Sequence, residues 1–168
     1  MRVDDVAIII STLNDADVRY LVVGGLAVVV HGYVRFTDDI DLVVQLDSEN
    51  VRRAMNVLQG LGYRPLVPVD AAEFADAAKR ERWRTEKNMK VFQLTNSERP
   101  DTRVDLFVYE PFDFDDAYRR APRELIFGSR APIVPLAELL DMKRAAGRPK
   151  DLGDIGELEV LKRHDESP

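Results

Sequence analysis

Residues 24 to 44 read GGLAVVVHGYVRFTDDIDLVV, and this stretch decides the fold. It opens with two glycines and ends in an apolar, β-branched segment of the kind that forms a buried strand. Asp39 and Asp41 stand inside that last segment, although aspartate is a poor strand former. Residues two apart on a strand project to the same side, so the two carboxylates share one face. The pattern has two interpretations, a polar strand edge or a metal site.

A third aspartate lies in the same kind of context. Asp105 has apolar strand formers on both sides in the segment RVDLFV. If the two strands are neighbours, three carboxylates converge, and a cation bound between them relieves their mutual repulsion. Carboxylate oxygens suit Mg²⁺ or Mn²⁺, and two such ions about 4 Å apart support an in-line nucleotidyl displacement. Metal ligands are therefore predicted at Asp39, Asp41 and Asp105, and the alternative is a surface salt bridge with Arg103.

The glycine pair follows a predicted strand and precedes a predicted helix. Residues 18–23 are β-branched and apolar, and residues 26–32 are expected to form a short helix. Such a turn brings bare backbone N–H groups close to a phosphate, because glycine accepts positive φ and permits close approach. Gly24 and Gly25 are thus predicted to bind phosphate, with an ordinary turn as the alternative.

Helices and strands alternate along the rest of the chain. Apolar periodicity and β-branched composition predict their positions. The expected helices are 3–13, 26–32, 48 to 60 or 62, 71–82, 113–120, 136–146 and one more from Pro149. Ser48 is the expected N-cap of the third helix, and Gly147 is expected to cap the helix 136–146. The expected strands are 18–23, 40–46, 63–67, 89–95, 102–109, 124–128 and 133–135. This mixture indicates an α/β or α+β fold with a single mixed sheet flanked by helices. The 168 residues are expected to form one domain, with a core over about 15–110 and short C-terminal helices over about 111–163.

Composition restricts the class of protein. The chain has no cysteine, which excludes disulfides and thiolate metal sites. The N-terminus carries acids at once, unlike a signal peptide, and no apolar run approaches the length of a membrane span, so a cytoplasmic protein is expected. The formal net charge of −6 argues against bulk electrostatic binding of nucleic acid. The basic segment 79–90 has two interpretations, a local RNA-binding patch or a solvated helix.

Together these motifs resemble the signature of the DNA polymerase β-like nucleotidyltransferase superfamily. The similarity rests on GG, thirteen residues and then DID inside an apolar strand, followed later by VDLF. The string RFTDDIDLVV looks like the variant in small bacterial nucleotidyltransferases of the abortive-infection and toxin–antitoxin type. In that group an arginine and a threonine commonly precede the metal aspartates, as Arg35 and Thr37 do here. Residues 136–155 are also similar to its C-terminal part, so the resemblance implies the nucleotidyltransferase fold.

The resemblance implies a role for each matching residue. Asp39 and Asp41 would bind both metal ions, and Asp105 would bind one ion and help to deprotonate the attacking hydroxyl. Gly24 and Gly25 would contact the triphosphate. Many members have serine at the second of these positions, so the backbone alone would bind phosphate at this turn.

Basic residues near these motifs are candidates for phosphate contacts. Arg35 can bind a phosphate through two N–H groups, and Thr37 lies beside it in the sequence. Lys143 shares a helical face with three leucines, so it either snorkels at the edge of that face or reaches the β- and γ-phosphates. Lys150, next to the start of the following helix, is a second candidate.

The resemblance implies a metal-dependent enzyme with two Mg²⁺ or Mn²⁺ ions. It would transfer an NMP from an NTP such as ATP to a hydroxyl and release pyrophosphate. The acceptor would be an RNA 3′ end, a protein side chain or a small molecule such as an antibiotic, bound across a homodimer or on a partner because the chain is short. The alternative is a non-catalytic nucleotide- or partner-binding module of the same fold, such as one half of a toxin–antitoxin pair with its cognate antitoxin.

Overall fold

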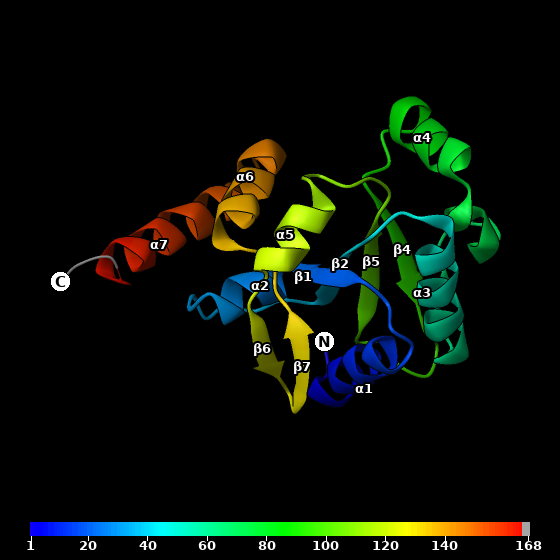
Figure 1. The fold of residues 1–168 in the computed structure, drawn as a ribbon, viewed down its shortest axis with the longest axis horizontal. Coiled ribbons are helices and arrows are strands. Elements are labelled where there is room, and N and C mark those ends of the chain that lie inside the picture. The colour runs from blue at the N-terminus through cyan, green and yellow to red at the C-terminus, as the bar shows by residue number, and fades with distance from the viewer. Residues whose placement is uncertain (166–168) are drawn as a thin grey trace.

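The computed structural model describes residues 1–165. Within them, the strands form a five-stranded sheet, here named the main sheet, in the order β1-β2-β5-β4-β3, and a separate hairpin of β6 and β7 (Figure 1). The strands are β1 (Tyr20–Val23), β2 (Asp39–Val44), β3 (Arg64–Pro65), β4 (Val91–Thr95), β5 (Arg103–Phe107), β6 (Arg123–Ile126) and β7 (Ser129–Pro132). β2 and β5 are parallel, whereas the other neighbours in the main sheet are antiparallel. The expected mixed sheet flanked by helices is confirmed.

Helices cover the main sheet and extend beyond it. They are α1 (Val3–Asp15), α2 (Gly24–Val30), α3 (Ser48–Gly60), the 3-10 helix η1 (Ala71–Ala75), α4 (Ala77–Glu86), α5 (Phe114–Arg120), α6 (Leu136–Ala146) and α7 (Pro149–Asp165). Helices α6 and α7 project from one end of the molecule, and α4 stands at the other (Figure 1). Helix α2 packs on both β2 and α6, which connects the projecting pair to the sheet. None of the helices in residues 1–165 combines the length and the apolar character that crossing a membrane requires.

One face of the main sheet is apolar and buried. The even-numbered residues of β2 and β5 are fully buried hydrophobic side chains. The apolar sides of α1 and α3 belong to the same core, and α3 packs against both β2 and α1. Because side chains alternate along a strand, Asp39, Asp41 and Asp105 project from the opposite face. This opposite side is here named the carboxylate face.

The helix expected over residues 71–82 is two helices. Asp76 lies between η1 and α4 with an extended backbone, and its side chain accepts hydrogen bonds from the N–H groups of Ala78 and Lys79. This cap begins a new helix instead of continuing the first one. The strand expected over 63–67 is also shorter, because Pro65 ends β3 and has no N–H to donate to a ladder.

The C-terminal third differs from the expectation in two ways. Residues 123–132 form the separate hairpin, which turns at Phe127 and Gly128, both with positive φ as two-residue hairpin turns require. The hairpin contacts α1 and β1, and beyond it the N–H of Val134 donates to the carbonyl of Val22. The expected strand 133–135 is therefore one bridge beside β1. Helix α7 has 17 residues, so the C-terminal helices are not all short.

The N-cap of α3 is Asp47, not the expected Ser48. The Asp47 carboxylate accepts hydrogen bonds from the N–H groups of Glu49 and Asn50. We expect Asp47→Ala to lower the free energy of unfolding by about 1 kcal/mol, because two N–H groups at the helix start lose their partner. Ser48→Ala is the matched control, with a change below about 0.5 kcal/mol. Urea denaturation measures both, and equal losses would contradict the assignment of the cap.

Candidate nucleotide and metal site

The three aspartates singled out in the sequence come together on the carboxylate face. Parallel pairing of β2 with β5 sets Asp41 directly beside Asp105, and it sets Asp39 beside Arg103. Burial, with the charges of Asp105 and Asp39 adding to it, raises the pKa of Asp41 to about 7. Burial also raises the pKa of Asp105. The three carboxylates therefore project from the same face of two neighbouring strands, and their role as metal ligands stays a prediction.

Each of the three carboxylates has a hydrogen-bond partner in the protein. The bonds run from Arg103 Nε to Asp39 Oδ1 (2.6 Å), from Gln93 Nε2 to Asp105 Oδ1 (2.8 Å) and from the Gly25 N–H to the Asp41 carboxylate. The described residues contain no group of three or more histidine, cysteine, aspartate or glutamate side chains placed to hold a metal ion. The donor set nevertheless suits a divalent cation. It consists of carboxylate oxygens only. A bound cation would offset the repulsion between the ionised carboxylates of Asp41 and Asp105, whose pKa values are raised.

The two glycines leave room for other side chains of the site. Gly24 has a φ of +63°, and a Cβ at this position would lie 2.0 Å from Asp41 Oδ2. A Cβ on Gly25 would lie 2.4 Å from Thr37 Oγ1 and 3.0 Å from Arg35 Nη2. Both positions must be bare, because the side chains of Asp41, Thr37 and Arg35 occupy the space above the turn.

Thr37 brings a hydroxyl to this turn. Its Oγ1 lies where a side chain on Gly25 would begin, and it donates to the backbone carbonyl of Asp39 at 3.3 Å. The expectation that only backbone borders the turn is therefore incomplete, since the loop before β2 supplies a hydroxyl from outside it. The sequence placed Thr37 near the aspartates but gave no sign that it lies against the second glycine.

Two of the predicted phosphate contacts, Arg35 and Lys150, lie toward the aspartates. Arg35 reaches the glycine turn, and the positive charge of Lys150 lowers the pKa of Asp41. Arg148, which the sequence reasoning missed, is in the same region. Its pKa is raised first by its hydrogen bond to Asp151 and also by the charge of Asp41. Its place just before Pro149 and Lys150 was the signal available in the sequence.

Lys143 lies inside the protein, so its ammonium group does not snorkel to the surface as one of the two alternatives expected. It is only 4 % exposed, and its Nζ lies 2.6 Å from Asp154 and 3.3 Å from Asp151, both on α7. The structure thus directs the ammonium group toward two carboxylates of the neighbouring helix. A contact between Lys143 and a triphosphate stays a prediction.

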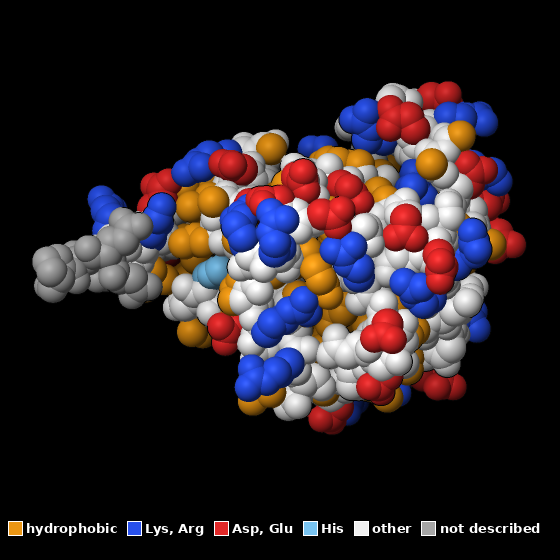
Figure 2. Space-filling model, in the orientation of Figure 1, with side chains coloured by type: hydrophobic (Ala, Val, Ile, Leu, Met, Phe, Trp, Pro, Cys, Tyr) orange, Lys and Arg blue, Asp and Glu red, His pale blue; other side chains and the backbone are white. Residues whose placement is uncertain are grey.

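Three of the six basic residues in the segment 79–90 form ion pairs with acidic neighbours. The pairs are Lys79 with Glu73, Arg82 with Glu86 and Arg84 with Glu81, while Arg80 is buried and donates to the carbonyl of Phe74. Trp83 stacks on Phe92 in the core. Figure 2 shows acidic and basic side chains interspersed where α4 lies. These contacts favour the solvated-helix interpretation over an RNA-binding patch.

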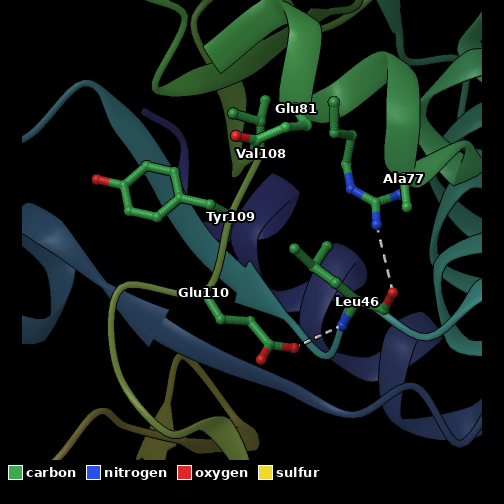
Figure 3. Close-up of a pocket in the computed structure, with 7 residues that line it drawn as sticks. Leu46, Ala77, Glu81, Val108, Tyr109 and Glu110 are labelled. Atoms are coloured by element: carbon green, nitrogen blue, oxygen red, sulfur yellow. Dashed lines mark hydrogen bonds between the residues drawn. The ribbon is translucent and has the colours of Figure 1, made fainter. Parts of the chain in front are cut away.

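A separate pocket of about 350 Å³ lies beyond the C-terminal ends of β2 and β5. It is lined by Leu46, Ala77, Arg80, Glu81, Val108, Tyr109 and Glu110 (Figure 3). Glu110 accepts from the N–H of Leu46 at 2.8 Å, and Arg80 donates to the carbonyl of Leu46 at 3.4 Å, so both charged groups hold the strand end. The predicted site residues lie toward the other end of β2, so this pocket is not the predicted nucleotide site.

Comparison with known proteins gives matches among solved structures. No protein-family profile and no curated protein sequence matches the chain. The chain is similar to the lincosamide antibiotic adenylyltransferase LnuA with bound lincomycin, at 16% identity over 94% of this chain and 96% of that chain, with a TM-score of 0.63. It is also similar to ANT(2'')-Ia in complex with adenylyl-2''-tobramycin, at 16% identity over 96% and 95% of the two chains, with a TM-score of 0.59.

The chain has the nucleotidyltransferase fold. The similarity extends over nearly the whole length of both chains in each pair. The solution structure of ANT(2'')-Ia also matches, at 18% identity over 96% of this chain and 89% of that one, with a TM-score of 0.58. The fold that the motifs GG, DID and VDLF implied is therefore confirmed. At sequence identities of 16% to 18% the comparison establishes the fold alone, and the roles of individual residues stay predictions.

Close packing at the glycine turn gives a stability prediction. We expect Gly25→Ala to lower the free energy of unfolding by roughly 1–3 kcal/mol, because the new methyl group forces Thr37 and Arg35 to move. Gly153→Ala on α7 is the matched control, since a Cβ there would meet no described atom within 4 Å. The control should be neutral or stabilise by up to about 1 kcal/mol. Urea denaturation measures both, and a Gly25→Ala protein as stable as wild type would contradict the packing described for this turn.

Ionisation of Asp41 should make the metal-free protein less stable as pH rises. Its pKa increases from 3.8 to about 7 on folding, so the folded protein holds the proton more tightly than the unfolded chain does between these values. The stabilising contribution of the neutral carboxyl is complete below about pH 4 and is lost as pH rises through about 7.

The matching variant is Asp41→Asn, which cannot ionise. Its free energy of unfolding, relative to that of wild type, should increase by at least about 1 kcal/mol between about pH 5 and pH 8 without divalent cations. Urea denaturation of both proteins at the two pH values gives this difference. The other titrating groups are common to both proteins and largely cancel. A difference that does not change with pH would show that burial and neighbouring charges do not perturb Asp41.

Proposed function

We propose that this chain is a metal-dependent nucleotidyltransferase, which moves an NMP from an NTP to a hydroxyl acceptor and releases pyrophosphate. The observation that carries the proposal is the register of β2 and β5, which sets Asp41 beside Asp105 with the glycine turn against Asp41. Carboxylates provide ligands for divalent cations, and Arg35 and Thr37, which lie against Gly25, provide donors for phosphate oxygens. The shared fold with two antibiotic-modifying enzymes supports the same reaction class.

Two Mg²⁺ or Mn²⁺ ions are the cofactor that the donor set suits. Asp39 and Asp41 would hold both ions, and Asp105 would hold one. When bound, the ions supply positive charge that neutralises the phosphates and stabilises the attacking and leaving oxygens. A cation beside Asp41 also favours its ionised form, so metal binding should be stronger above its pKa of about 7.

The remaining roles belong to side chains around the turn. Arg35, Thr37 and Lys150 would bind the anionic phosphates, because two of them are cationic and the third carries a hydroxyl against Gly25. Asp105 would accept the proton of the acceptor hydroxyl. The Gln93 amide engages Asp105 Oδ1, so Oδ2 is the oxygen left for that proton.

We propose a small molecule with a free hydroxyl as the acceptor. The structural neighbours are a lincosamide adenylyltransferase with lincomycin and an enzyme with adenylyl-2''-tobramycin, both small-molecule complexes. The pairing of the basic residues of α4 with acidic neighbours also argues against an extended RNA-binding surface. An RNA 3′ end, a protein side chain, a cognate antitoxin and a homodimer stay untested predictions of the sequence.

The proposal is tested by following label from an NTP. Purified protein is incubated with Mg²⁺ and each α-labelled NTP, in separate reactions with aminoglycosides, lincosamides, total RNA or lysate protein. We expect label in a small-molecule acceptor, with pyrophosphate released in equal amount.

The variants decide whether the predicted site does this chemistry. Asp41→Asn should lose at least about 100-fold in rate, because a metal ligand is lost. Asp38→Asn is the matched control, since Asp38 is an exposed carboxylate in the loop just before β2 and should retain activity. Label on RNA or protein would overturn the small-molecule acceptor. Folded wild type that transfers no label would contradict the proposed nucleotidyltransferase activity. An Asp41→Asn protein as active as wild type would contradict the proposed site.

A further inference from the structure

We infer that Asp154, on helix α7, is a positioning residue that holds the guanidinium of Arg35 at the glycine turn, where it binds the triphosphate of the nucleotide. This inference rests on the proposed function and assigns the C-terminal helix a part in nucleotide binding. Arg35 Nε lies 2.9 Å from Asp154 Oδ1, and Arg35 Nη2 donates to Asp154 Oδ2 at 3.1 Å. The guanidinium is thus held beside the carboxylate by one hydrogen bond from Nη2 and by the ion pair, whereas the buried Nε makes no hydrogen bond.

The segment around Arg35 does not fix that side chain by packing. Its neighbours in sequence, Val34 and Phe36, are 83 % and 78 % exposed. Within this segment, Arg35 Nη1 donates to the carbonyl of Phe36 at 2.8 Å. The buried carboxylate of Asp154 is therefore the anchor that reaches Arg35 from another element, 119 residues away in sequence. The contact with Asp154 places Arg35 Nη2 3.0 Å from the position that a Cβ on Gly25 would occupy.

The charges around Asp154 also favour an anion at this place. Asp154 is shared between Arg35 and Lys143, and Asp151 is shared between Lys143 and Arg148. In this chain of ion pairs among the described residues, three cations face two carboxylates, which leaves one positive charge in excess. The side chains of Arg35 and Lys143 are 20 % and 5 % exposed, so solvent screens their part of the excess charge poorly, whereas the Arg148 side chain is 61 % exposed. A phosphate at the adjacent glycine turn would balance it.

A rival explanation assigns the phosphate contact to Lys143. In that explanation Asp154 holds the ammonium group of Lys143 away from the phosphate. The two explanations predict opposite effects of Asp154→Asn. If Asp154 positions Arg35, the variant lets the guanidinium leave the turn and weakens triphosphate binding. If Asp154 withholds Lys143, the variant releases the ammonium and strengthens it. Lys143 keeps Asp151 as a partner in the variant, so no cation is left buried alone.

The experiment is a calorimetric titration at saturating Mg²⁺ with α,β-methylene-ATP, which is not cleaved at the reacting bond, and with AMP. We expect Asp154→Asn to weaken binding of the triphosphate by about tenfold, the effect of one lost charge-assisted contact, and to change AMP binding by less than about twofold. Glu159→Gln is the matched control, because Glu159 lies on the same helix and pairs with Arg144 at 2.8 Å, outside the chain of ion pairs. It should bind both nucleotides as wild type does.

A double-mutant cycle shows whether Asp154 acts through Arg35. Arg35→Ala should weaken triphosphate binding at least as much as Asp154→Asn, and the double variant should be no weaker than Arg35→Ala alone. Additive losses would overturn the positioning role. Triphosphate binding by Asp154→Asn that equals or exceeds that of wild type would overturn it as well, and tighter binding would favour Lys143.

Two controls separate other causes of failure. Thermal melting followed by circular dichroism checks that each variant is folded. If Asp154→Asn does not fold, Arg35→Gln decides in its place, since unchanged triphosphate affinity would overturn the inference and a selective loss for the triphosphate would support it. Wild-type protein that binds no nucleotide would contradict the proposed function itself, whereas normal wild-type binding with an unaffected Asp154→Asn contradicts only this inference.

Discussion

Parallel pairing of β2 with β5 is the constraint on which the site depends. The ladder puts Asp41 beside Asp105, and the antiparallel ladder on the other side of β2 puts Val23 beside Asp41. The chain therefore enters the Gly24–Gly25 turn at the level of the central carboxylate. A slip of one residue in β2 would turn its aspartates into the apolar core and its buried side chains toward the carboxylate face. The burial of the opposite face thus specifies the position of the charges.

The arrangement has an electrostatic cost in the metal-free protein. Burial disfavours the ionised form of Asp41, and repulsion from Asp105 and Asp39 adds to the effect, as its pKa of about 7 shows. The apolar core under α1 and α3 holds the strands in this register despite that cost. The hydrogen bonds from Gln93 to Asp105 and from Arg103 to Asp39 limit the repulsion between the carboxylates. The ion pair between Arg35 and Asp154 of α7 holds the segment before β2 against the turn. The carboxylates, the turn and the cationic residues thereby surround one place, although they come from distant parts of the chain.

The sequence predicted the features that depend on local periodicity. Alternation in DIDLVV and RVDLFV was enough to place three aspartates on one face of two strands. The glycine pair was enough to predict the end of β1, but Gly24 and Gly25 are the first two residues of α2 and not a turn before the helix expected over 26–32. It did not separate Asp47 from Ser48 as the N-cap of α3, because both residue types are good caps. It also missed the break at Asp76, since apolar periodicity continues through that position.

Contacts between distant elements could not be predicted in the same way. The partners of Lys143 lie on the next helix, 8 and 11 residues further along, and only the angle between α6 and α7 brings them to its ammonium group. The contact from Arg35 to Asp154 crosses 119 residues. The place of Thr37 against Gly25 depends on the path of the loop before β2. The separation of the β6-β7 hairpin from the main sheet likewise follows from its packing on α1 and β1.

The central claim is that Asp39, Asp41 and Asp105 form one metal-dependent nucleotide site. Electron paramagnetic resonance of Mn²⁺, titrated into the protein with α,β-methylene-ATP present, tests it most directly, because the free ion gives a signal that is lost on binding. With one nucleotide per chain, the account predicts that wild type removes two Mn²⁺ ions per chain from the free signal, counting the ion that the nucleotide carries. It predicts that Asp41→Asn, with its fold intact, removes fewer. Equal uptake of Mn²⁺ by the two proteins would contradict it.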